Sequence, residues 1–152
     1  MPDDQSREAA IRALSDWDIG VRSVEPLTLS ENIVFKVTDH AGQAFVLRLH
    51  RPGYHDLNEL ISEQRWTAAL LEAGLDVPVP RSTREGREYT SIDLGDERRY
   101  AGLLEWVDGV PMQCLLENKP DTGFIADSYS CLLYTSDAAD EGLGVDLGGR
   151  RI

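Results

Sequence analysis

Hydrophobic and polar residues alternate most clearly between positions 21 and 50 of this 152-residue chain. Short apolar runs predict three strands there, at Val24–Leu29, Ile33–Thr38 and Ala44–His50. The first two are separated by Ser30-Glu31-Asn32, and an Asp- and Gly-containing turn at 39–42 separates the second from the third. The sequence therefore predicts an antiparallel meander in this region.

A helical repeat precedes the meander. Ser6 is its expected N-cap, and Gly20 is its expected end. Apolar residues at helical spacing would bury one face of this helix: Ala10, Ile11, Leu14 and Trp17.

A second and longer helix is predicted over Asp56–Ala73. Asp56 and Glu59 have the spacing of a capping box, and Gly74 is a natural left-handed C-terminus. The expected apolar stripe consists of Leu57, Leu60, Ile61, Ala68 and Leu71. Glu63 lies on a neighbouring face, which it shares with Leu60, Trp66 and Leu70.

The sequence after this helix predicts an extended segment followed by a hairpin. Val77–Pro80 must be extended, because each proline disfavours helix in the residue before it. Glu88–Leu94 and Arg98–Val107 predict a hairpin that turns at Gly95-Asp96, and Pro111 is the expected start of another helix. The predicted fold class is α+β, with a five-stranded antiparallel sheet, one long helix across a face and an N-terminal helix.

Beyond about residue 127 the composition changes. Residues 128–152 are acidic and Gly-rich, without sustained periodicity after Leu133. The sequence of these residues resembles the translated adaptor read-through found at the end of a truncated reading frame. The alternative is that they form a genuine disordered extension of the protein. The expected organisation is an N-terminal helix at 1–20, a lobe at 21–112, a linker or truncated second lobe at 113–127, and this tail.

Composition narrows the class of protein. The formal net charge is −12, which argues against binding to nucleic acid or to anionic membranes. No apolar run reaches the ~20 residues that a bilayer requires. The acidic N-terminus is not a signal peptide, and Cys114 and Cys131 form no C-x-x-C pair, so a cytoplasmic protein is expected.

Arg48 is the first candidate for chemistry. The strand around it has one apolar face, formed by Phe45, Leu47 and Leu49. Arg48 lies on the other face with Val46 and His50, so we expect the first face to pack on a helix and the second to line a cleft. The alternative is a solvated strand arginine.

Glu63 is the second candidate, because its predicted position is close to Arg48. The short strand–turn–helix connection brings the two together, and a buried arginine needs such a carboxylate partner. Taken alone, Glu63 is equally explained as an exposed helix acid. The histidines at 40, 50 and 55 have no spacing suited to a metal site, so no metal ligand is expected from them.

Several stretches together resemble the amino-terminal lobe of the aminoglycoside phosphotransferase and choline/homoserine kinase-like family. The resemblance covers about Val24 to Met112. Its residues are Ser30-Glu31-Asn32-Ile33-Val34-Phe35, the run Phe45–Tyr54, Glu63, Val77-Pro78-Val79-Pro80, and Leu104-Glu105-Trp106-Val107-Asp108-Gly109.

The resemblance implies an ATP-dependent transfer of a phosphoryl group to a hydroxyl of a small molecule. It implies that Arg48 binds phosphate with Glu63 as its helix partner, and that the loop residues Ser30 and Asn32 cover the phosphates. It also implies that the backbone near Glu105 and Val107 binds adenine, enclosed by Leu104 and Trp106.

The same resemblance predicts what the chain lacks. No H-G-D-x-x-x-x-N loop occurs in the sequence, so no catalytic residue is expected here, and the base and the Mg²⁺ ligands would come from a missing lobe. The chain alone is therefore expected to be an inactive fragment. Two alternatives remain: a stand-alone nucleotide- or protein-binding module without catalysis, and a structural domain in which Arg48 and Glu63 form only an internal ion pair.

Overall fold

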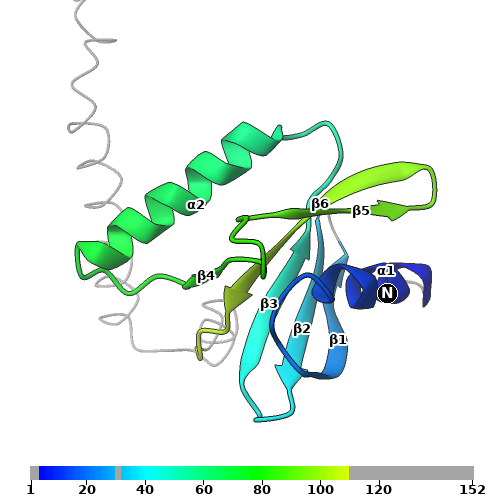
Figure 1. The fold of residues 1–152 in the computed structure, drawn as a ribbon, viewed down its shortest axis with the longest axis horizontal. Helices are drawn as coiled ribbons and strands as arrows, with labels where there is room; N and C mark the ends of the chain where they lie inside the picture. The colour runs from blue at the N-terminus through cyan, green and yellow to red at the C-terminus, as the bar shows by residue number, and fades with distance from the viewer. Residues whose placement is uncertain (1–3, 30–31, 110–152) are drawn as a thin grey trace, which may run out of the picture. The chain divides into compact units, whose positions relative to one another are not determined.

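The computed structural model describes residues 4–29 and 32–109 of the chain (Figure 1). It divides into two compact units, and the first, Met1–Val107, holds every helix and strand described. The expected helix at Pro111, the segment 113–127 and the tail 128–152 lie outside the described residues. The elements are α1 (Asp4–Leu14), β1 (Val21–Leu29), β2 (Ile33–Asp39), β3 (Ala44–Leu49), α2 (Leu57–Glu72), β4 (Pro80–Arg81), β5 (Thr90–Leu94) and β6 (Glu97–Glu105).

The strands form one antiparallel sheet in the order β1-β2-β3-β6-β4, with β5 paired to β6. The predicted meander and the predicted hairpin are both present, and the hairpin turns at Gly95, whose φ is 60°. The sheet has six strands rather than five, because Pro80–Arg81 adds a two-residue strand beside β6. The α+β fold class is confirmed.

The hydrophobic core fills one face of the sheet, between the strands and α1. Alternation in β2 and β3 sends every second side chain into it. Its largest fully buried members are Trp17, Phe35, Phe45, Leu14, Leu47, Leu49, Leu103 and Val37. The apolar face of β3 therefore packs on a helix as expected, and that helix is α1.

Helix α1 corrects three expectations. It ends at Leu14, and the chain continues to Trp17 through turn hydrogen bonds, so Gly20 is not its end. Ser6 is buried inside the helix rather than capping it. Ile11 is 49% exposed, because the buried face consists of Ala9, Ala10, Ala13 and Leu14, which recur at three- and four-residue spacing away from it.

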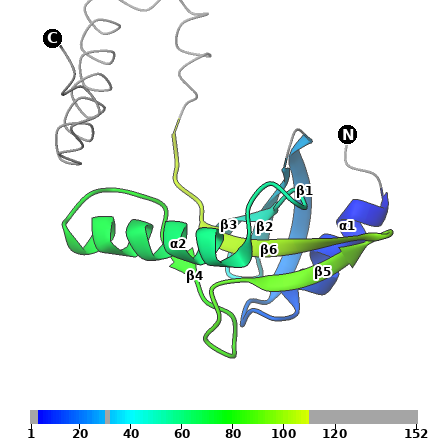
Figure 2. The same ribbon diagram turned by 90° about the horizontal axis from the view of Figure 1, so that it is seen from above.

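Helix α2 begins as predicted. The Asp56 carboxylate accepts from the Glu59 N–H, and the Glu59 carboxylate accepts from the Asp56 N–H, both at 2.9 Å. Gly74, with φ 83°, follows its end. The expected apolar stripe is poorly covered, however, since only Leu60 and Gln64 are buried and Ala68 is exposed. Figure 2 shows α2 alongside the strands. Its residues other than Leu60 and Gln64 are exposed or half-buried.

Candidate functional site

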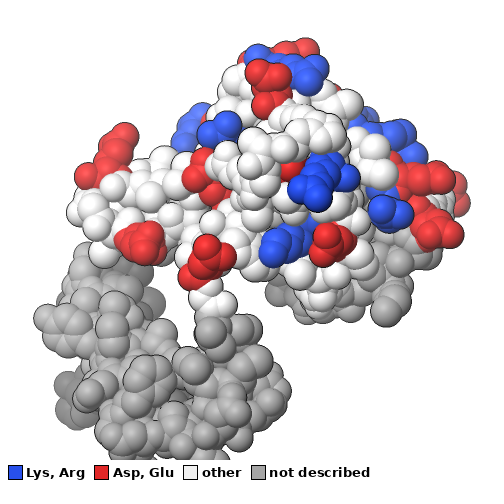
Figure 3. Space-filling model, turned by 90° about the horizontal axis from the view of Figure 1, so that it is seen from below, with Lys and Arg blue, Asp and Glu red and all other residues white. Residues whose placement is uncertain are grey.

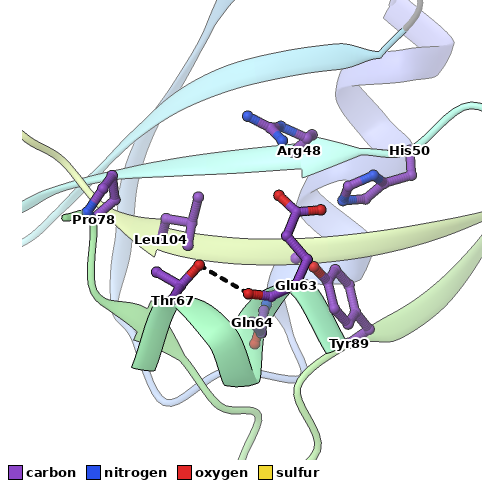
Figure 4. A pocket seen from close by; sticks show the side chains of 9 residues that line it. Arg48, His50, Glu63, Gln64, Thr67, Pro78, Tyr89 and Leu104 are labelled. Atoms are coloured by element: carbon purple, nitrogen blue, oxygen red, sulfur yellow. Dashed lines mark hydrogen bonds between the residues drawn. The ribbon is translucent and has the colours of Figure 1, made fainter. Parts of the chain in front are cut away.

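A cavity of about 190 Å³ lies between α2 and the face of the sheet opposite the core (Figure 4). Strands β3 and β6 form its floor, and α2 forms its wall. The lining residues are Arg48, His50, Glu63, Gln64, Thr67, Pro78, Tyr89, Gly102 and Leu104. The mixed face of β3 therefore lines a cleft, as its alternation predicted.

Gly102 shapes the floor of this cavity. It pairs with Arg48 across β3 and β6, and the Tyr89 ring lies directly over it. A Cβ at position 102 would stand 2.5 Å from Tyr89 Cε1, so a side chain there would force the Tyr89 ring to move. Tyr89 also meets the His50 ring edge-to-face, with centroids 5.5 Å apart. The glycine thus lets an aromatic pair close one end of the cavity.

Three residues of α2 reach the cavity because their spacing places them on one face. Gln64 is buried and donates from Nε2 to the Glu88 carbonyl (3.3 Å). Thr67 donates from its hydroxyl to the Glu63 carbonyl one turn earlier (2.9 Å; Figure 4). These bonds fix Gln64 and Thr67, and the Glu63 carboxylate remains directed toward β3 (Figure 4).

The predicted ion pair between Arg48 and Glu63 is not formed. Within the described residues no ion pair or hydrogen bond joins them, and Arg48 Nε is buried without a partner. Glu63 occupies an exposed position of α2, and only Leu60 and Gln64 of this helix are buried. The internal ion pair described by the structural-domain alternative is therefore absent among the described residues, and that alternative stays a hypothesis.

Few of the side chains that line the cavity are charged at neutral pH. Desolvation by burial, followed by the charges of Arg48 and His55, lowers the pKa of His50 to about 4, so its ring is uncharged. Burial raises the pKa of the Tyr89 hydroxyl. Among the lining residues, only Arg48 and Glu63 then carry a formal charge.

The same face of the sheet continues past the cavity to Trp106. Lys36 on β2 lies with its Nζ 4.4 Å from the centroid of the Trp106 ring, so the two reach across β3. Alternation in β2 and β6 places both on the side of Arg48 and Leu104. Lys36 and Trp106 therefore border the apolar side chains on this face of the sheet, among them Val46 and Leu104.

The edge of β6 is only partly covered. The Glu105 N–H donates to the Val79 carbonyl (2.8 Å), and its carboxylate meets Arg81 Nη1 at 3.2 Å. Val107 is 51% exposed, and its N–H has no hydrogen-bond partner among the described residues. The edge therefore offers a free backbone donor just past the end of the strand.

The loop between β1 and β2 is described only in part. Asn32 accepts from the Arg51 N–H at its side-chain oxygen (3.0 Å), which ties this loop to the segment after β3. Ser30 lies outside the described residues. Of the six residues expected to bind ATP, the structure brings Arg48 and Glu63 to one cavity, whereas Asn32, Glu105 and Val107 do not line it.

Sequence reasoning missed part of the lining. His50 was placed on the correct face by alternation but was assigned no role. Gln64 carried no usable signal, because an amide on a helix is explained by structure alone. For Tyr89 and Gly102 the signal was the hairpin register, since a turn at Gly95-Asp96 that pairs Leu94 with Glu97 also sets positions 89 and 102 opposite each other.

Charges on the face shown in Figure 3 are mixed, with acidic and basic side chains interspersed among the described residues. The described residues also contain surface ion pairs, such as Arg87–Glu85 at 2.7 Å and Arg65–Glu88 at 3.7 Å. Such pairs stabilise by only ~0–1 kcal/mol each. No helix in this part of the chain is long and apolar enough to cross a membrane.

The described residues do not suit a metal ion. They contain no group of three or more His, Cys, Asp or Glu side chains that could hold one.

Comparisons with known proteins give two informative matches. A microcompartment-associated aminopropanol kinase shares 33% identity with a TM-score of 0.61 over 69% of this chain and 33% of that one. The amicoumacin kinase hAmiN, solved with AMP-PNP, Ca²⁺ and Ami, shares 20% identity with a TM-score of 0.60 over 71% of this chain and 32% of that one. No protein-family model and no curated protein matches the chain.

Both solved structures are aminoglycoside phosphotransferase-like kinases. The chain spans about a third of the length of each. The resemblance expected from the sequence is therefore confirmed.

Proposed function

We propose that this chain, which has the fold of one lobe of the aminoglycoside phosphotransferase-like kinases, binds the nucleotide in an ATP-dependent phosphotransferase. The enzyme would move the γ-phosphoryl group of ATP to a hydroxyl of a small molecule. The observation that carries this proposal is Arg48, a strand arginine that has no side-chain partner among the described residues and faces Glu63 across a cavity in a kinase-like fold.

The base of the nucleotide would bind at the edge of β6. The Val107 N–H is an unpaired donor for a ring nitrogen of adenine, and the Glu105 carbonyl lies on the same edge two residues earlier. Leu104 and Val46 provide apolar contacts for the ring on the face of the sheet beside this edge. Trp106, held by Lys36, borders the same side chains.

The phosphates would bind toward Arg48. A guanidinium forms two parallel hydrogen bonds to phosphate oxygens, and this one makes no competing bond to the described residues. Glu63 would orient the guanidinium once α2 moves closer. Ser30 and Asn32 would cover the phosphates from the β1–β2 loop, where the Asn32 amide still has its N–H₂ group to donate.

Catalysis of phosphoryl transfer consists almost entirely of positioning and electrostatic stabilisation. We assign the described residues a cation for the phosphates and an edge for the base, whereas the sequence contains no H-G-D-x-x-x-x-N loop and the described residues contain no group of three or more metal-ligating side chains. We propose that both come from a second lobe of a longer protein. The 152-residue chain alone would then bind ATP weakly and transfer no phosphate.

The test compares this chain with a longer reading frame that contains a second lobe. Only the longer protein should show Mg²⁺-dependent turnover. In it, Arg48→Ala should cost ~2–4 kcal/mol of transition-state stabilisation, about 30- to 900-fold in kcat/KM. Arg65→Ala is the matched control, because that arginine is exposed on α2 and pairs only with Glu88.

Two results would contradict the proposal. One is phosphoryl transfer by the 152-residue chain itself after it has been freed of host kinases. The other is an Arg48→Ala enzyme whose kcat/KM equals that of the Arg65→Ala control.

A further inference from the structure

The side of α2 that faces away from the sheet carries the most exposed large apolar side chain among the described residues. This side chain is Trp66, which is 66% exposed. Ser62, Ala69 and Ala73 are exposed at helical spacing on the same side, and we call these four positions the outer face of α2. Figure 1 shows the described strands on the other side of the helix, where Leu60 and Gln64 are buried.

The outer face is separate from the site proposed for the nucleotide. None of its four residues lines the cavity, and none belongs to the edge of β6. The helical repeat explains the separation, because the residues of α2 that line the cavity project from the side nearer the sheet. A partner on the outer face would therefore leave Arg48 and the base edge free.

The shape of the outer face fits another helix of the same kind. Its positions are separated by four, three and four residues, which is the spacing with which two helices pack side by side. Trp66 protrudes from this face, whereas the small side chains of Ala69 and Ala73 leave room beside it. A surface that holds both the protruding group and the space for it can pair with a second copy of itself about a two-fold axis.

Charges beside the outer face favour the antiparallel form of such a pair. Arg65 and Glu72 flank the face on the same side of α2, seven residues apart. The Arg65 side chain is 74% exposed and has only a 3.7 Å ion pair with Glu88, and Glu72 has no ion pair within residues 4–29 and 32–109. When two helices run antiparallel, the same flank of each meets the other, so Arg65 can stand opposite Glu72 of the second copy.

One register satisfies both the shape and the charges. A two-fold axis between positions 68 and 69 sets position 65 opposite position 72 of the second copy. The same axis sets Trp66 opposite position 71, which lies midway between Ala69 and Ala73. Each tryptophan then fills the space beside the small residues of the other copy, and each copy contributes one end of two ion pairs.

We propose that two copies of this chain form a two-fold dimer through the outer faces of α2, packed antiparallel with Trp66 as the anchor. One pair of short helices buries less than the roughly 1,200 Å² at which stable interfaces begin, so we expect a weak dimer with a Kd of about 100 µM. This inference goes beyond the proposed kinase function, because the pairing requires neither a nucleotide nor a second lobe.

The oligomeric state of the 152-residue chain tests the proposal. Sedimentation equilibrium from about 10 µM to about 1 mM protein should show a reversible monomer–dimer equilibrium. Trp66→Ser should raise the Kd at least about tenfold, because tryptophan anchors commonly dominate the affinity of an interface. Leu27→Ser is the matched control, since Leu27 is 48% exposed on β1 and lies outside the proposed interface.

A charge exchange tests the antiparallel arrangement. Arg65→Glu sets two carboxylates against each other and should raise the Kd about fivefold, and Glu72→Arg should do the same with two guanidinium groups. The double variant with both changes should return the Kd to within about twofold of the wild-type value. Arg22→Glu is the control, because it makes the same change of charge at an exposed position of β1.

Three results would overturn the proposal. They are a chain that stays monomeric at about 1 mM, a dimer that Trp66→Ser weakens no more than Leu27→Ser does, and a double charge variant that dimerises as weakly as the single variants. Far-UV circular dichroism verifies that each variant keeps the wild-type fold. None of these measurements involves a nucleotide or turnover by a longer protein, so failure here is distinguishable from failure of the kinase proposal.

Discussion

The two faces of the sheet differ although the same strands build both. The face toward α1 is closely packed, and Phe35, Leu47, Leu49 and Leu103 on it are fully buried. The face toward α2 has a cavity, an unpaired arginine and a histidine whose pKa burial lowers to about 4. Adjacent residues of β3 alternate between these environments, so one six-residue strand serves both stability and a candidate site.

Shortening a side chain should lower the free energy of unfolding strongly on the face toward α1 and only slightly on the face toward α2. Leu47→Ala should lower the free energy of unfolding by ~2–5 kcal/mol, because it leaves a void in a packed core. Leu104→Ala should cost only about 1 kcal/mol, since this half-buried leucine already borders open space. Urea unfolding of both variants measures the difference. Equal losses would show that the second face is packed as closely as the first.

The second prediction concerns pH and His50. Its pKa in the folded chain, about 4, lies below the ordinary value of 6.5, so the unfolded chain takes up a proton first as the pH falls. Stability should therefore be complete above pH 6.5 and be lost as the pH falls toward 4. From pH 7 to pH 5 the expected loss is about 2 kcal/mol.

A pair of variants isolates the contribution of His50. His50→Gln should remove this part of the pH dependence, whereas His40→Gln should keep it, because the His40 side chain is exposed. Stability curves of the wild type and His50→Gln that run parallel between pH 7 and pH 5 would contradict the assignment.

The third prediction uses the capping box to separate α2 from the core. Asp56→Ala removes a hydrogen bond of 2.9 Å to the Glu59 N–H and should cost about 1 kcal/mol. Because α2 is little buried, amide exchange should accelerate within α2 and not in β3. Glu72→Ala is the control at the other end of the helix. Uniform acceleration across the sheet would mean that α2 unfolds only with the core.

The smallest predicted effect has the opposite sign. Arg48→Met should raise the free energy of unfolding by about 0.5 kcal/mol, because it replaces a partly buried guanidinium whose Nε has no partner among residues 4–29 and 32–109. Arg81→Met should give no such gain, since Arg81 has an ion pair with Glu105. Thermal unfolding compares the two. A clear loss in Arg48→Met would reveal a stabilising contact of Arg48.

The sequence by itself determined the elements and the two faces of β3. Alternation at Phe45–His50 fixed which side chains are buried, and the Asp56–Glu59 pair and Gly74 fixed the limits of α2. These are local properties, because the direction of a strand side chain and the hydrogen bonds of a helix end depend on near neighbours. The resemblance to kinases used the same local runs and was confirmed.

Only the tertiary structure decided how far apart the elements lie. The sequence placed Arg48 and Glu63 near each other but could not fix their separation, which depends on how α2 packs through Leu60 and Gln64. The predicted hairpin, continued one pair beyond Thr90 and Ala101, already sets Tyr89 opposite Gly102, but only the tertiary structure brings the Tyr89 ring against His50. Distances across a cavity depend on the packing of distant segments, and no periodicity in a single chain records them.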